Sequence, residues 1–157
     1  MTSNHGTAGG GAITVASSKQ LTISGAASFT SNTSNNGGAI INNGTLKITA
    51  NATFKNNAGT NAGGAIYNAY GASLIIHAQN EDVVFYNNTA GGEYNDIHQA
   101  GSPSGTSTPT IKLKADTGRQ MVFNGSITGG KWVDVDNGFA EKASTAGTIS
   151  INYDNVK

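Results

Sequence analysis

Residues 54–68 read FKNNAGTNAGGAIYN, and both halves of this stretch recur along the chain. The first half, FxxN, recurs as FTSN at 29–32 and FYNN at 85–88, with a looser copy, FNGS, at 123–126. The second half, GGAI, follows each of the first copies at a similar distance. Residues 54–68 are therefore one copy of a two-part unit on which the rest of the chain can be aligned.

The GGAI motif returns at a nearly constant spacing. Its copies are GGAI at 10–13, 37–40 and 63–66, GGEY at 91–94 and GGKW at 129–132. The second glycines of the first four copies are at positions 11, 38, 64 and 92, so they lie 27, 26 and 28 residues apart. A fixed period of this size predicts a solenoid or another repeat architecture.

Each repeat also contains a short strand with apolar residues at alternate positions. These triplets are LTI at 21–23, LKI at 46–48, LII at 74–76, IKL at 111–113 and ISI at 149–151. Alternation places the first and third residues on one face of a strand and the middle residue on the other. The middle residues are Thr, Lys, Ile, Lys and Ser, of which all but Ile are polar. The triplets therefore predict strands with one buried face.

A third apolar column closes each repeat. It consists of Phe29, Phe54, Phe85 and Phe123, with Val83 and Met121 as the alternate inward residues of the last two copies. Three asparagines, Asn32, Asn57 and Asn88, each lie three residues after a phenylalanine. Asparagine favours turns, and stacked asparagine side chains can hydrogen-bond one another in ladders. We expect these three to cap stacked turns rather than to bind a ligand.

Together the columns predict an all-β fold, a right-handed parallel β-helix (solenoid) of about five coils with three short strands in each. The coils are expected to start near Gly10, Gly37, Gly63, Gly91 and Gly129. Gly38 and Gly64, the second glycines of two motifs, are expected where the chain turns tightly or neighbouring coils approach closely.

We expect a single domain over residues 1–157, with the FxxN/GGAI repeats at 9–98 and further coils at 111–157. Residues 99–110 contain both prolines of the chain. Proline lacks the donor that a sheet ladder needs, so this segment is predicted to leave the stack as a loop. Such a loop could carry a binding function, or it could be a variable insertion without a partner.

FxxN paired with GGAI resembles the polymorphic outer-membrane protein repeat found in passenger domains of autotransporters. The resemblance covers residues 9–98, and NDI at 95–97 looks like the close of such an array. It implies a right-handed parallel β-helix, display at a Gram-negative-type cell surface or outside the cell, and a role in adhesion or aggregation. It also implies that the membrane is reached only through a C-terminal barrel, which is expected outside these residues, as is a signal peptide.

The composition disfavours several other classes of protein. Charged residues make up 11% of the chain and the formal net charge is zero, whereas a nucleic-acid binder needs an excess of Lys and Arg. Cysteine is absent, so disulfides and thiolate metal sites are excluded. No apolar run approaches the roughly 18 residues of a membrane helix. We expect no cofactor.

Parallel β-helices also include enzymes that act on polysaccharides, and such catalysis needs clustered carboxylates. The candidate residues are Asp134 with Asp136, Asp96 with His98, and the group Glu81, Asp82, Asp116 and Arg119. The two pairs have i, i+2 spacing and are expected on one strand face. No third group completes either pair, so we expect solvated strand and turn residues and no catalytic site. The histidines His5, His77 and His98 are unclustered, so no metal site is expected.

Two hypotheses of function follow. The first is a non-catalytic segment of a surface-displayed adhesin, which binds a host-cell or matrix receptor or associates with itself. Its contacts would come from residues 99–110 and from exposed polar and aromatic residues, including Tyr67 and Tyr70. The alternative is a polysaccharide-active lyase or hydrolase, which should place three or more outward acids in one patch.

Overall fold

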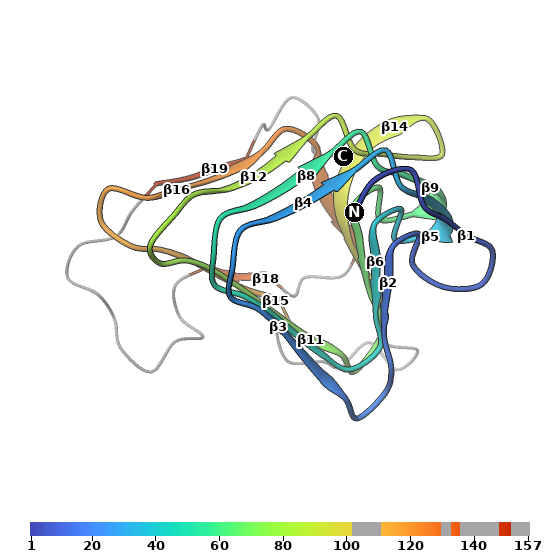
Figure 1. The fold of residues 1–157 in the computed structure, drawn as a ribbon, viewed down its shortest axis with the longest axis horizontal. Helices are drawn as coiled ribbons and strands as arrows, with labels where there is room; N and C mark the ends of the chain where they lie inside the picture. Colours follow the sequence, from blue (N-terminus) through green and yellow to red (C-terminus); the bar gives the residue numbers. More distant parts are fainter. Residues whose placement is uncertain (102–110, 130–132, 136–147, 152–157) are drawn as a thin grey trace.

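The computed structural model describes residues 1–101, 111–129, 133–135 and 148–151, which form strands and turns and no helix. Three stacks of parallel strands enclose the core, and a fourth stack projects from one corner (Figure 1). The stacked coils form a parallel β-solenoid, as the sequence predicts, with about four turns where the sequence analysis expects about five. A fifth rung, β17 to β19, is described in part.

The four stacks are named after the motifs that build them. The GAI sheet consists of β2 (Ile13–Val15), β6 (Ile40–Asn42), β10 (Ile66–Asn68), β14 (Glu93–Gln99) and β17 (Ser126–Gly129). The Leu/Ile sheet consists of β3 (Gln20–Ile23), β7 (Thr45–Ile48), β11 (Ser73–Ala78), β15 (Ile111–Ala115) and β18 (Val133–Val135). The Phe sheet consists of β4 (Ala27–Thr30), β8 (Ala52–Lys55), β12 (Val83–Tyr86), β16 (Gln120–Phe123) and β19 (Thr148–Ile151). The arm consists of β1 (His5–Gly6), β5 (Thr33–Asn36), β9 (Ala58–Ala62) and β13 (Thr89–Ala90).

The predicted inward columns are confirmed over the first four repeats. Leu46 pairs in register with Leu21 and Leu74, and all inward residues of β7, β11 and β15 are buried. The phenylalanine rings stack with centroids 4.8, 4.7 and 4.7 Å apart from Phe29 through to Phe123. Burial of these side chains between coils supplies the core that no single coil could form alone.

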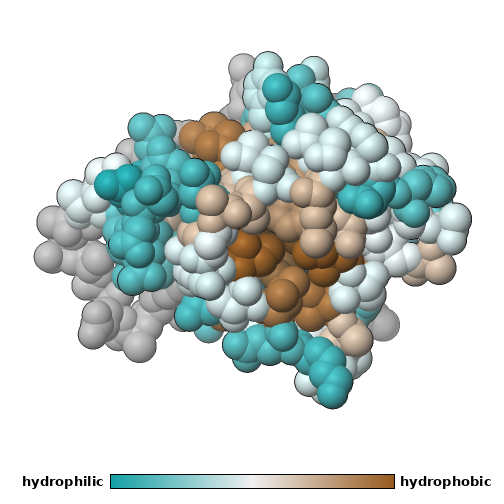
Figure 2. All heavy atoms as spheres, viewed as in Figure 1, coloured by the Kyte–Doolittle hydropathy of each residue, from teal (hydrophilic) through white to brown (hydrophobic). Residues whose placement is uncertain are grey.

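Figure 2, drawn in the same view as Figure 1, looks along the stack onto its first rung. It shows hydrophobic residues gathered in the centre, with hydrophilic residues around them. At this end Ile13, Leu21 and Ile23 of the first rung are only half-buried. In the next rung Ile40, Leu46 and Ile48 are fully buried, because β2 and β3 pair with β6 and β7. The packing of one coil on the next is thus what buries the core.

The glycine pairs are placed as expected. Gly37 and Gly63 have φ of 62° and 65°, a left-handed conformation that glycine adopts without strain. A Cβ added to Gly38 would lie 2.5 Å from the backbone nitrogen of Ala58 in the next coil, and a Cβ on Gly64 would collide with the backbone of Thr89 and Asn95. The second glycine of each motif therefore permits the close approach of neighbouring coils.

The number of strands per coil differs from the prediction. Between FxxN and GGAI the first three coils contain an additional strand, β5, β9 or β13, which belongs to the arm. The polar and glycine-rich sequence of these segments, such as TSNN in β5, lacks the apolar alternation that predicts a strand. Pairing with the neighbouring coil makes them strands.

The predicted register of the last two glycine pairs is wrong. Gly91 and Gly92 form the tight turn between β13 and β14, the one antiparallel pair of the described strands, with φ of 59° and 88°. It is Ile97, within NDI, that pairs with Ile66 of GGAI. Gly129 lies at the end of β17, opposite Gln99. The coils therefore do not start at Gly91 and Gly129.

The triplet at 149–151 is not in the Leu/Ile sheet, where the sequence pattern places it. It lies in β19, which pairs with β16 of the Phe sheet, so that Ile151 is opposite Phe123. The fifth strand of the Leu/Ile sheet is β18, where Val133 is opposite Ile111. An apolar–x–apolar triplet fits both sheets, and the phenylalanine that distinguishes them is replaced by isoleucine here. The predicted loop at 99–110 begins after Gln99 ends β14, and residues 102–110 lie outside the described residues.

Candidate functional site

The motif residues themselves are part of the core. Phe54 and Asn57 of FxxN, and Ala65 and Ile66 of GGAI, have no exposed surface. A side chain without exposed surface cannot contact a partner of the folded chain. The motifs therefore fix the geometry of the coil, and the surface available for binding lies in the segments between them.

The predicted asparagine ladder is confirmed and extends further than expected. Asn32 donates from its backbone N–H and its Nδ2 to Oδ1 of Asn57, over 3.0 and 2.9 Å. Asn57 makes the same two bonds to Asn88, over 3.0 and 2.9 Å. At the other end Asn4 donates to Asn32 in the same way, so MTSN at the N-terminus is a further FxxN copy with Met1 in place of phenylalanine.

The residue before each ladder asparagine directs the chain into the arm. Ser31, Asn56 and Asn87 have φ of 54°, 54° and 52°. This left-handed conformation is one that asparagine tolerates better than most residues. This conformation turns the chain out of the Phe sheet. The ladder asparagine that follows bonds backbone groups at the turn, such as the Phe54 carbonyl oxygen, to which Asn88 Nδ2 donates. The arm therefore leaves the stack at the same place in each coil.

The ladder ends on a carboxylate. Nδ2 of Asn88 donates to Oδ1 of Asp96 over 2.8 Å, and the backbone N–H of Gly125 donates to Oδ2 over 2.6 Å. Burial raises the pKa of Asp96 from its ordinary value of 3.8 to about 6, although the hydrogen bonds from Asn88, Gly125 and Asn124 act to lower it. Because both oxygens accept, a carboxylate suits this position better than an amide.

Asp96 and His98 therefore do not form a pair, contrary to the expected common face. The register of β14 shifts between Asn95 and Ile97, which turns Asp96 into the ladder. His98 lies on the outer side of the GAI sheet, where its ring stacks on Tyr67 at a centroid distance of 5.4 Å. A strand irregularity of this kind overrides the i, i+2 rule on which the prediction depended.

The arm carries exposed neutral side chains. Thr33 and Asn35 of β5, and Thr60 and Asn61 of β9, are exposed. None of the four described arm strands contains Lys, Arg, Asp or Glu. The arm thus presents hydroxyl and amide groups at intervals set by the stacking of the coils.

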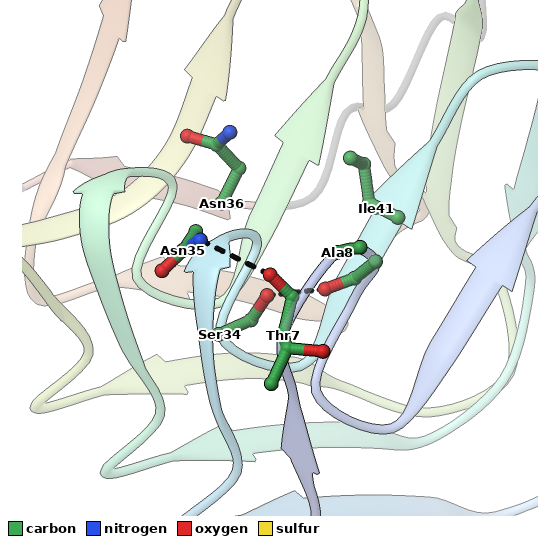
Figure 3. Close-up of a pocket in the computed structure, with 7 residues that line it drawn as sticks. Thr7, Ala8, Ser34, Asn35, Asn36 and Ile41 are labelled. Carbon is green, nitrogen blue, oxygen red and sulfur yellow. Dashed lines mark hydrogen bonds between the residues drawn. The ribbon is translucent and has the colours of Figure 1, made fainter.

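A small pocket lies in the corner between the arm and the outer side of the GAI sheet (Figure 3). It is lined by residues 7–9 before β2, by 34–36 of β5 and by Ile41 of β6. Nδ2 of Asn35 donates to the carbonyl oxygen of Thr7 over 3.1 Å, and the Ser34 hydroxyl donates to that of Gly9. These two bonds hold the first loop against the arm.

The outward residues of the GAI sheet continue from this pocket along the stack. In register they are Thr14, Ile41, Tyr67, His98 and Thr128. His98 Nδ1 lies 3.0 Å from the Thr128 hydroxyl, and burial lowers the pKa of His98. We call this row of side chains the outer column, and Ile41 is its member that lines the pocket.

A second corner, between the Leu/Ile and Phe sheets, collects most of the charged candidates. The turns that follow β11 and β15 are stacked, since the backbone N–H of Asp116 donates to the carbonyl oxygen of Ala78 over 2.9 Å. These turns carry Glu81, Asp82, Asp116 and Arg119. The sequence separation between the two turns hides this proximity, and the register of the coils reveals it.

Two of these carboxylates make specific contacts. Asp116 Oδ1 lies 2.9 Å from His77 Nε2 and 3.8 Å from Lys114 Nζ, and Asp82 Oδ1 accepts from the backbone N–H of Gln120 over 2.8 Å. Asp134 lies in β18 opposite Lys112, and Asp136 lies outside the described residues. In the described ranges no three His, Asp or Glu side chains are arranged to hold a metal ion.

The three histidines lie on different parts of the fold. His5 is on the arm, His77 on the Leu/Ile sheet and His98 on the GAI sheet. Nδ1 of His5 lies 2.8 Å from the Thr33 hydroxyl of the next coil. Within the described part of the chain, no helix is long and apolar enough to cross a membrane.

Comparison with known proteins identifies the repeat. The model of the Chlamydia polymorphic membrane protein (Chlamydia_PMP) repeat matches residues 51–69, which contain both FKNN and GGAIYN. No curated protein and no solved structure matches the chain. The match covers β8, β9 and β10, one strand each from the Phe sheet, the arm and the GAI sheet. The resemblance indicated by the two motifs is thereby confirmed.

Proposed function

We propose that this chain, which carries a polymorphic membrane protein repeat at residues 51–69, is a non-catalytic segment of a surface-displayed autotransporter adhesin. It would act at the outer membrane or outside the cell, where it would bind a host-cell or matrix receptor or associate with itself. The repeat supports the surface location, since its family is one of membrane-associated surface proteins.

One observation supports binding as the role of the chain. The recurring Phe and Asn of FxxN and the Ala and Ile of GGAI are buried in the stacked coils, while the segment between the motifs projects as the arm (Figure 1) with exposed side chains, among them Asn35, Thr60 and Asn61. The stacked coils hold these groups in fixed positions, because backbone and side-chain ladders join each coil to the next. Individual contacts of this kind are weak, and many displayed copies would add avidity.

The alternative, action on a polysaccharide, is supported by the acids collected at the second corner. Asp82 and Asp116 are described there, each already bonded to a neighbouring group of the fold. Carboxylates that cap a backbone N–H or pair with histidine are typical structural contacts. Turnover of a polysaccharide by the purified chain, abolished by Asp82→Asn or Asp116→Asn, would favour the enzyme over the adhesin.

Cell-surface display tests the adhesin proposal. The segment would be displayed on non-adherent bacteria, and autoaggregation and binding to cultured host cells and matrix proteins would be measured. We expect display to increase at least one of these, and a folding-defective Gly64→Val variant, displayed at the same level, to lose the increase. A second variant without residues 102–110 tests the contribution of the predicted loop. No gain in any of the assays would contradict the proposal.

A further inference from the structure

The corner between the Leu/Ile and Phe sheets has a step between its second and third coils. β11 ends two residues beyond the last residue that it pairs with β7. β15 continues this extension, since Ala115 is opposite Ala78. The turn of the third coil, at 79–82, therefore starts further out than the turns of the first two coils, at 24–26 and 49–51.

A pocket of about 260 Å³ lies at this step. It is lined by Ser24 and Ala26, by residues 49–51, and by Asn80 and Glu81 of the longer turn. We call it the ledge pocket. Five of its polar side chains make no hydrogen bond or ion pair with the described residues, and these are Ser24, Thr49, Asn51, Asn80 and Glu81. The ledge pocket thus holds donors and acceptors that the fold does not use.

The chain contains five copies of Asn-x-Ser/Thr, which begin at Asn32, Asn43, Asn51, Asn87 and Asn124. Asparagine glycosyltransferases recognise this sequence, the N-glycosylation sequon. Burial separates the five copies. The first asparagine is in the ladder and has no exposed surface, the second, fourth and fifth are half-buried, and only Asn51 is exposed. Ser34 and Ser126, which complete the first and last sequons, are buried as well.

The two groups that define the exposed sequon lie on the same side of the chain. Asn51 ends the turn before β8, and Thr53 is the second residue of that strand. Ala52 between them points inward and is fully buried, so its neighbours on both sides face outward. Neither the Asn51 amide nor the Thr53 hydroxyl bonds another described residue. Both groups are therefore available to an enzyme that reads the sequon.

We propose that Asn51 is the acceptor for N-linked glycosylation in the folded chain, and that the attached sugar lies in the ledge pocket. The nitrogen that would carry the sugar belongs to a side chain of this pocket. The hydroxyls of Ser24 and Thr49 and the amide of Asn80 would then bond sugar hydroxyls. This modification goes beyond the adhesive role and does not depend on it.

The transfer needs a nucleotide-activated sugar as its second substrate. Nδ2 of Asn51 would attack the anomeric carbon of the sugar and form the new C–N bond. The bond from that carbon to the phosphate oxygen breaks, and the nucleoside diphosphate leaves with the bonding electrons. A base of the transferase takes the proton that Nδ2 loses. The chain itself supplies only the acceptor and the site for the sugar.

Incubation of the folded chain with a soluble asparagine glucosyltransferase and UDP-glucose, followed by peptide mass spectrometry, tests the acceptor. We expect one hexose, on Asn51. Thr53→Ala keeps Asn51 but removes the hydroxyl of the sequon, so it should lose the modification while circular dichroism shows an unchanged fold. Asn80 is the internal control, because it is an exposed asparagine of the same pocket without Ser or Thr two residues later. It should stay unmodified.

NMR of the isotopically labelled chain tests the position of the sugar. The side-chain amide signals of Asn80 should shift when Asn51 carries glucose, and those of Asn61, on the arm, should not. Three results would overturn the inference: no hexose on Asn51, a hexose on another sequon in preference to it, or equal modification of Thr53→Ala. Unshifted Asn80 signals would overturn the placement in the ledge pocket. None of these experiments measures adhesion, so the adhesin proposal stands or fails separately.

Discussion

Nδ2 of Asn88 donates to Oδ1 of Asp96 over 2.8 Å, and this bond joins a ladder of amides to a buried carboxylate. Along the ladder each asparagine donates to Oδ1 of the next, from Asn32 to Asn57 to Asn88. A run of donors with one direction needs an acceptor at its end. Asp96 supplies this acceptor at the coil where the arm ends. In the following coil β17 pairs directly with β14, and no arm strand lies between β16 and β17.

Loss of one member of the ladder should destabilise the fold strongly. In Asn88→Ala, the N–H and Nδ2 groups of Asn57 lose their acceptor and the Phe54 carbonyl loses a donor, all of them buried. Unsatisfied buried groups cost about 1–3 kcal/mol each, so we expect a loss of roughly 3 kcal/mol or more in the free energy of unfolding. Asn61→Ala, at an exposed arm position, should cost under about 0.5 kcal/mol. Urea denaturation of both variants checks this, and similar losses would contradict it.

The buried carboxylate should make stability depend on pH. The pKa of Asp96 is about 6 in the folded chain against an ordinary 3.8, so the folded chain binds the proton more tightly. The free energy of unfolding should therefore rise as the pH falls from about 6 towards 4, by roughly 3 kcal/mol at most. His98 acts in the opposite direction, since its lowered pKa makes its contribution fall as the pH drops below 6.5.

Comparison with Asp96→Asn separates the two groups. His98 is present in both proteins, so its contribution cancels when their unfolding free energies are subtracted. The remaining difference should change with pH only between about 4 and 6. We expect denaturation at a series of pH values to show this change with the unchanged chain gaining stability on acidification. A difference that is constant over this range would mean that Asp96 titrates at its ordinary pKa.

The phenylalanine stack provides a test of the core. Phe54 lies between the rings of Phe29 and Phe85 and is fully buried. Phe54→Ala should lower the free energy of unfolding by about 3–5 kcal/mol, because it opens a cavity between two coils. Lys47→Ala, on the outer side of β7, should cost less than about 0.5 kcal/mol. Equal losses in the melting temperature would be inconsistent with the register of the Phe and Leu/Ile sheets.

The glycine motif can be tested with a single methyl group. Gly64→Ala places a Cβ against the backbone of Thr89 and Asn95, which neighbouring strands prevent from moving. We expect a loss of about 3 kcal/mol or failure to fold, at the upper end of the cost of overpacking. Gly25→Ala is the control, because a Cβ at Gly25 meets no atom within 4 Å. Circular dichroism melts of the two variants should differ clearly, and a stable Gly64→Ala protein would refute the close approach of these coils.

The sequence predicts the solenoid because its period, its apolar columns and its turn residues all agree. The arm escaped prediction, because β5 and β9 are polar or glycine-rich and become strands only by pairing with neighbouring coils. The register error at Gly91 has a similar origin. A glycine pair serves both a hairpin turn and a coil corner, and only the pairing of Ile66 with Ile97 distinguishes them.

The candidate site was less predictable than the fold. Tyr67 is predicted as a contact residue, but its stacking on His98 depends on the pairing of β10 with β14, which the glycine pair at 91–92 does not predict. The pocket between the arm and the GAI sheet is lined by residues 34–36 of β5, so it could not be predicted without the arm. One signal was available: MTSN at the N-terminus repeats the pattern of FTSN, which places Asn4 in the ladder.

The most direct test of the account is to alter the arm without altering the motifs. The variant replaces Thr33, Asn35, Thr60 and Asn61, all exposed, by alanine, and the control replaces Thr22 and Lys47 on the outer side of the Leu/Ile sheet. Both should fold, and the arm variant should lose only a little stability, because the side-chain bonds of Asn35 to Thr7 and of Thr33 to His5 that it removes are exposed. Displayed on non-adherent cells at equal levels, the arm variant should lose most of the adhesion or aggregation, and the control should keep it. Unchanged adhesion by the folded arm variant would contradict the claim that the arm is the contact surface.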